Sequence, residues 1–140
     1  MIEGMTLADS SIIIESIRPS GCANAVKRVR DLATADRLAV WDVVVGEVLI
    51  GARTERAYQK IYDLLLGFES LATPDDVWQR AARVGFDLRR KGVTVPLTDL
   101  AIAVVAIEHE VPLVHMDKHF ELIAQVCDLD HEYVSPTDED

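Results

Sequence analysis

Four acidic side chains, Asp9, Glu47, Asp99 and Asp117, are the residues of this sequence best placed to do chemistry. Taken singly, an acid after a strand or at a helix start is usually a cap or a turn residue. Several carboxylates that converge repel one another strongly unless cations lie between them, and hard divalent ions such as Mg²⁺ and Mn²⁺ prefer oxygen ligands. If the fold brings these acids together, they form a metal site.

The elements that would position these acids alternate between short apolar strands and helices. This alternation favours an α/β fold with a parallel sheet covered on both faces. Strands are predicted at 5–8, 38–40, 111–114 and 131–134, and helices at 12–14, 22–32, 43–50, 57–68, 74–91 and 99–108, with a short one around 120–123.

The order of these elements predicts that the acids share one edge of the sheet. Asp9 follows the first strand, and Asp117 comes shortly after the strand at 111–114. Asp99 opens the helix that leads into that strand, and Glu47 lies on the helix after the second strand. In an open parallel sheet, ligands gather beyond the carboxyl ends of the strands. We therefore expect all four carboxylates to face one cleft.

Helix ends are predicted from capping residues. Asp42 and Thr98 are expected to cap the helices that follow them, and Thr73 with Pro74 is expected to start another. Gly92 is expected to end that helix.

Length and composition predict one domain. The chain has 140 residues, 49% of them apolar, so we expect a single domain over 1–134 and an acidic, flexible tail at 135–140. The longest uncharged apolar run has eight residues, against about 20 for a membrane-spanning helix. The start of the sequence lacks the features of a secretion signal. A cytoplasmic protein with no membrane association is expected.

The charge balance does not decide the function. With 24 acidic residues against 14 Lys and Arg, the net charge of −10 disfavours a protein that binds nucleic acid through its whole surface. It is compatible with a nuclease that concentrates carboxylates around cations. Basic side chains near the first two acids are interpreted as solvated helix faces rather than RNA contacts; they are Arg18, Lys27, Arg28, Arg53 and Arg56.

Four segments of the sequence, 7–12, 43–52, 96–103 and 114–120, resemble in order and context the four acidic motifs of PIN-domain nucleases. The likeness is closest to the VapC toxins of VapBC modules. The resemblance implies a three-layer α/β/α sandwich with a short parallel sheet of four to five strands. It also implies that Asp9, Glu47, Asp99 and Asp117 hold one or two Mg²⁺ or Mn²⁺ ions, while Ser11 supports the site next to the first Asp.

The resemblance further implies an activity and partners. The activity would be endonucleolytic cleavage of RNA by a metal-activated water, as the toxin component of a type II toxin–antitoxin system. The partners would be a second copy of the chain in a homodimer and an antitoxin of VapB type. An apolar segment of that antitoxin would occupy a groove between helices.

One position departs from the family pattern. Many relatives have Thr two residues before the fourth acid, where this sequence has His115, so the hydrogen bonding around Asp117 is open. His115, Asp117 and His119 alternate along the chain. On an extended segment they would face one way and could bind a transition metal, which is an alternative to the all-oxygen site.

Two other functions remain as alternatives. One is a catalytically silent PIN fold that acts only as a binding module. The other is a Mg²⁺-binding phospho-acceptor receiver domain, which would need an acidic pair before its first helix and a Lys after its last strand. The turn here reads Asp9-Ser10-Ser11, and that Lys is missing.

Overall fold

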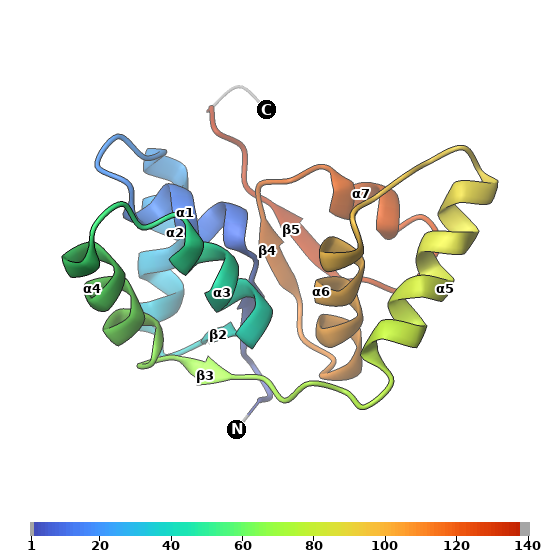
Figure 1. The fold of residues 1–140 in the computed structure, drawn as a ribbon, viewed down its shortest axis with the longest axis horizontal. Helices are drawn as coiled ribbons and strands as arrows, with labels where there is room; N and C mark the ends of the chain where they lie inside the picture. The colour runs from blue at the N-terminus through green and yellow to red at the C-terminus, as the bar shows by residue number, and fades with distance from the viewer. Residues whose placement is uncertain (1, 138–140) are drawn as a thin grey trace.

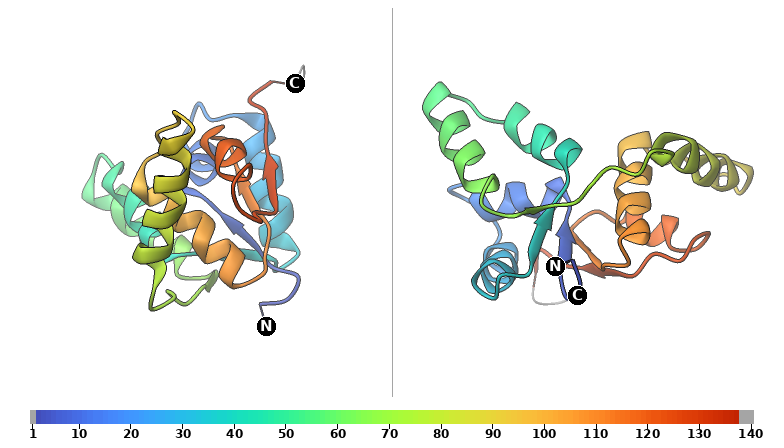
Figure 2. Two further views of the ribbon diagram at one scale, coloured as in Figure 1. Left: turned by 90° about the vertical axis from the view of Figure 1, so that its right-hand side faces the viewer. Right: turned by 90° about the horizontal axis from the view of Figure 1, so that it is seen from below.

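The fold is organised around a five-stranded, all-parallel sheet with the strand order β3-β2-β1-β4-β5, shown in a computed structural model that describes residues 2–137 (Figure 1). Helices lie against both faces, which confirms the predicted three-layer α/β/α sandwich (Figure 2). The strands are β1 (Thr6–Ala8), β2 (Leu38–Val40), β3 (Glu69–Ser70), β4 (Leu113–His115) and β5 (His131–Tyr133).

The three central strands are apolar and buried on both faces. In β1, Leu7 pairs with Ala39 of β2 on one side and with Leu113 of β4 on the other. All nine residues of β1, β2 and β4 are buried. Strand β3 was not predicted, because its two residues, Glu69 and Ser70, are exposed and carry no apolar pattern.

The helices begin and end near the predicted positions. The helix predicted at 12–14 extends over a full eight residues, and the one predicted at 57–68 ends before Phe68. They are α1 (Ser10–Ile17), α2 (Ala23–Thr34), α3 (Asp42–Ile50), α4 (Glu55–Leu65), α5 (Val77–Arg90), α6 (Leu97–Glu108) and α7 (His119–Ile123). Among residues 2–137, no helix is long and apolar enough to span a bilayer.

The predicted helix start at Thr73 is wrong. Helix α5 begins only at Val77, and the hydroxyl of Thr73 instead accepts a hydrogen bond of 2.8 Å from the indole N–H of Trp41. That contact joins two segments 32 positions apart in the sequence, so local capping rules do not reveal it. Gly92, with φ at +81°, follows the end of α5 as predicted.

The predicted caps at Asp42 and Thr98 are also wrong. Asp42 is already the first residue of α3, after Trp41, and Thr98 lies inside the first turn of α6, which starts after Pro96. Neither N-cap residue makes a capping hydrogen bond with its side chain, because the side chains of Trp41 and Pro96 have no acceptor atom. A proline before the first turn suits such an entry, since its φ is already fixed.

Helix α6 carries one of the acids into the centre of the molecule. Every residue from Leu100 to Ala106 is buried, because α5 packs along one side of this helix and α7 and α3 contact it elsewhere (Figure 1). The apolar run of this helix is therefore buried on several sides. Asp99, in its first turn, is therefore held on a rigid element.

The expected flexible tail begins with residues that have contacts. The carbonyl of Ser135 accepts a hydrogen bond of 2.9 Å from the Asn24 amide, and the Cys22 thiol lies 3.6 Å from the Pro136 carbonyl. Residues 138–140 of that tail lie outside the described residues.

Candidate active site

Asp9 lies at the carboxyl end of the central strand, where the chain turns into α1. It is the N-cap of this helix and accepts a hydrogen bond of 3.4 Å from the backbone N–H of Ile12. Its side chain is buried, with only 2% of the residue exposed. Burial raises the pKa of Asp9 from 3.8 to about 7; hydrogen bonds from Ser11 and Ile12 oppose this rise, and the charge of Asp99 adds to it.

Ser11 connects Asp9 to the loop after β4. Its hydroxyl lies 2.7 and 2.8 Å from the two carboxylate oxygens of Asp9 and accepts a hydrogen bond of 3.1 Å from the backbone N–H of Met116. One hydroxyl therefore orients the first acid and fixes the segment that carries the fourth.

Asp99, Asp117 and His119 form the tightest cluster of the site. The Nδ1 atom of His119 lies 3.0 Å from Asp99 Oδ2 and 3.3 Å from Asp117 Oδ1, and one potential ligand atom from each residue lies within 4.8 Å of the others. Asp117 Oδ1 also accepts the backbone N–H of His119 at 2.9 Å. Burial raises the pKa of Asp99, helped by the charge of Asp117 and opposed by the hydrogen bond from His119.

Glu47 projects from α3 toward the same acids. Its Oε1 atom is buried and has no hydrogen-bond partner within residues 2–137. Burial and the charge of Asp99 raise the pKa of Glu47, whereas a hydrogen bond with Ser10 lowers it. Burying a carboxylate oxygen without a hydrogen-bond partner costs free energy, so this atom is well placed to coordinate a cation.

The structure therefore brings the other three predicted acids within electrostatic reach of Asp99. Asp117 and Asp99 both contact the imidazole of His119. Asp9 and Glu47 lie outside the 4.8 Å cluster, but their pKa values are affected by the charge of Asp99. Burial and mutual repulsion oppose the ionised state of these acids, and a cation would relieve both. The donor set is mainly carboxylate oxygen with one imidazole nitrogen, which fits Mg²⁺ or Mn²⁺.

His115 does not belong to this cluster, so the structure does not support the alternating His-Asp-His arrangement. Its ring is fully buried in β4, where Nδ1 accepts the backbone N–H of Asp117 at 3.2 Å and Nε2 lies 2.9 Å from Nδ1 of His131. Burial lowers the pKa of His115 from 6.5 to about 4; His131 contributes to the decrease, and the charge of Asp117 opposes it. His115 is therefore a neutral residue that supports the site by accepting the backbone N–H of Asp117.

Sequence reasoning missed two participants. His119 appeared only in the transition-metal alternative, although its place two residues after an acid at a helix start was a usable signal. His131 carried no local signal, because its contact with His115 depends on the pairing of β5 with β4.

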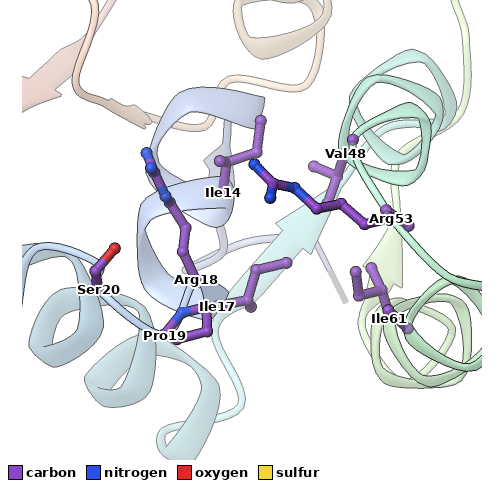
Figure 3. A pocket seen from close by; sticks show the side chains of 11 residues that line it. Ile14, Ile17, Arg18, Pro19, Ser20, Val48, Arg53 and Ile61 are labelled. Carbon is purple, nitrogen blue, oxygen red and sulfur yellow. The ribbon is translucent and has the colours of Figure 1, made fainter.

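A groove lies beside this site, between α1 and the pair α3–α4 (Figure 3). It encloses a cavity of about 590 Å³ whose lining is mainly apolar and includes Ile14, Val48 and Ile61. Two basic side chains, Arg18 and Arg53, extend along the same cavity (Figure 3). Val48 directly follows Glu47, so the groove and the acid cluster share a helix.

Two comparisons with known sequences agree with each other. The family model described as PIN domain matches residues 6–126. The chain is 34% identical over 128 residues to the VapC ribonuclease Mb1587 of Mycobacterium bovis, an alignment that covers 89% of this chain and 96% of that protein. It is 31% identical over 134 residues to ribonuclease VapC51 of Mycobacterium tuberculosis, with 93% of each covered.

Solved structures share the fold. A chain in the crystal structure of VapBC2 from Rickettsia felis, bound to a DNA fragment of its promoter, superposes with a TM-score of 0.74 at 19% identity and covers 92% of this chain and 98% of its own. A chain of VapBC-1 from nontypeable Haemophilus influenzae gives a TM-score of 0.72 at 22% identity, covering 92% and 97%.

Proposed function

Because the chain belongs to the PIN-domain family, we propose that it is a divalent-metal-dependent endoribonuclease and the toxin component of a type II toxin–antitoxin pair, acting in the cytoplasm. The observation that carries this proposal is the set of acids around Asp99 at the carboxyl edge of the sheet. The similarity to proteins named VapC ribonucleases over most of the chain supports RNA as the substrate.

In this proposal Asp9, Glu47, Asp99 and Asp117 hold one or two Mg²⁺ or Mn²⁺ ions. A bound ion of this kind supplies a water of lowered pKa and positive charge for the phosphate oxygens. Glu47 contributes its Oε1 atom, which has no hydrogen-bond partner in the described part of the chain. Ser11 holds the carboxylate of Asp9 in one orientation, which pre-organises this acid.

Cleavage of RNA should depend on added metal. We expect purified protein to cut a mixed cellular RNA pool with Mg²⁺ or Mn²⁺ and to lose that activity in EDTA, because the proposed mechanism takes its activated water from the bound ion. The measurement is the appearance of new RNA ends in each condition. Equal cleavage with EDTA would contradict the proposal, and metal binding without cleavage of any RNA would favour the silent binding module.

The groove beside the site is the proposed binding surface for the antitoxin. Its apolar lining suits an apolar side chain, and Arg18 and Arg53 suit acidic residues on either side of it. Arg18 already pairs with Glu15 at 2.7 Å, so the partner's acid would compete with that exposed pair. Chains in solved VapBC complexes share this fold, which supports a partner of VapB type.

A charge placed in this groove should weaken the complex. We expect Ile61→Asp to reduce the affinity for a cognate VapB-type antitoxin by on the order of 100-fold, because it puts a carboxylate into a desolvated apolar contact. The affinity is measured by calorimetry with both proteins folded. Gln59→Asp, on the same helix but outside the groove, is the control; equal weakening by both would indicate that the partner binds elsewhere.

A homodimer is also proposed. Trp78 and Phe86 on α5 and Leu97 at the start of α6 are exposed to 43%, 51% and 51%, although they are large apolar side chains. Exposed apolar surface of this kind is typical of protein contacts. Two of these residues lie on α5, a helix that packs mainly along α6 and lies at one end of the molecule (Figure 1).

A further inference from the structure

We infer that His115 and His131 act as a hydrogen-bonded pair through which the edge strand β5 positions Asp117. This inference rests on the proposed function, since it concerns the orientation of one of the acids. It begins with the segment from Met116 to His119, in which three backbone N–H groups donate to side chains. Met116 donates to Ser11, Asp117 donates to His115, and His119 donates to Asp117.

The hydrogen bonds fix which nitrogen of each ring carries the proton. Because Nδ1 of His115 accepts the Asp117 N–H, it is unprotonated, and the proton of the neutral ring is on Nε2. That N–H donates to Nδ1 of His131, 2.9 Å away, which must in turn be unprotonated. A change at His131 therefore reaches the backbone of Asp117 through one imidazole.

Packing holds this arrangement in place. The ring centroid of His115 lies 5.1 Å from that of His131, 4.8 Å from Phe120 and 5.8 Å from Tyr133. In the sheet, His115 pairs with Tyr133, and His131 pairs with Leu113 two residues earlier, so both histidines lie on the same face.

The chemistry of a buried histidine supports a positioning role. An apolar side chain would fill this place in β4 without needing partners, whereas a buried imidazole is costly unless both nitrogens are hydrogen-bonded. His131 satisfies the nitrogen that Asp117 does not use. Without that acceptor, the His115 ring would lose the bond that fixes its tautomer and its orientation.

Two variants of His131 separate positioning from packing. Asn places an oxygen close to the position of Nδ1 and keeps the acceptor, whereas Leu fills similar space without one. We expect His131→Leu to weaken Mn²⁺ binding by about 10-fold and His131→Asn to leave it within about twofold, as is typical when a partner of a ligand-bearing group is lost. Calorimetric titration of Mn²⁺ into each folded protein gives the values.

The control is Glu132→Gln on the same strand. It breaks the 2.8 Å ion pair with Arg28 and perturbs β5, but it does not touch His115. We expect it to change stability and to leave the Mn²⁺ affinity unaltered. Equal affinities for wild type and His131→Leu would overturn the inference.

A spectroscopic measurement tests the pair independently of metal. In ¹⁵N-histidine NMR spectra of the metal-free wild type, His115 should show an unprotonated Nδ1 and a protonated Nε2. Nδ1 of His131, which accepts the hydrogen bond from Nε2 of His115, should also be unprotonated. A protonated Nδ1 on His115 would sink the inference even if His131→Leu failed to fold. If the wild type showed the expected tautomers but bound no Mn²⁺, the proposed function would fail while the pair itself stood.

Discussion

Asp99→Asn should lower metal-dependent RNA cleavage by roughly 10³-fold, a loss typical of removing a charge that acts directly on the reacting groups. Asp99 is chosen because its charge reaches the other three acids: it raises the pKa of Asp9 and Glu47 and shares His119 with Asp117. Asparagine keeps the shape and the first turn of α6. The initial rate of cleavage of one defined RNA, at saturating Mn²⁺, gives the size of the loss.

The control for this variant is Asp31→Asn on α2. Asp31 is exposed and pairs only with Lys27 at 3.0 Å, an interaction of little energetic weight on a surface. Like Asp99→Asn, the Asp31→Asn substitution removes one negative charge from a chain of net charge −10, but it lies outside the site. A loss of similar size in both variants would point to a general electrostatic effect, and an active Asp99→Asn protein would remove Asp99 from the site.

Asp9→Asn should stabilise the metal-free protein by about 4 kcal/mol at pH 8. The folded-state pKa of Asp9 is about 7 against 3.8 for the free side chain. Between these two values the folded state binds more protons than the unfolded state, so the free energy of unfolding falls as the pH rises through this window. Above pH 7 the full destabilisation remains, and asparagine removes it.

Urea unfolding in EDTA at pH 8 and pH 5 measures this effect. At pH 5 the folded protein keeps Asp9 largely protonated, so the advantage of Asp9→Asn should shrink by more than half. Added Mn²⁺ at pH 8 should stabilise the wild type more than the variant, because the carboxylate is then compensated. A variant less stable than wild type at pH 8 would show that the hydrogen bonds from Ser11 and Ile12 outweigh the burial of the charge.

The parts of the fold that local patterns determine were predictable. The apolar triplet Leu38–Val40 is a strand with the predicted bounds, and the uncharged run at 100–107 predicted the buried helix α6. Parallel strands that end in acids then placed Asp9 and Asp117 at one edge of the sheet. These conclusions needed only side-chain periodicity and the rule that ligands gather beyond the carboxyl ends of parallel strands.

What the sequence did not reveal depends on contacts between distant segments. Thr73 is a residue type that often caps helices, but its hydroxyl accepts a hydrogen bond from the indole N–H of Trp41 instead. The role of His115 was open because its partner, His131, comes from a strand that forms only when β5 pairs with β4. The buried, unpartnered oxygen of Glu47 likewise follows from packing between α3 and the residues around it.

The bond from Met116 to Ser11 joins residues 105 positions apart, across the pairing of β1 with β4. During synthesis the chain emerges from its amino end. Strand β1 is therefore made early, whereas its pairing partner β4 is made near the end of translation. Until Asp117 has left the ribosome, the four acids cannot all meet. We therefore expect a growing chain, and any product truncated before Asp117, to lack the complete acid cluster.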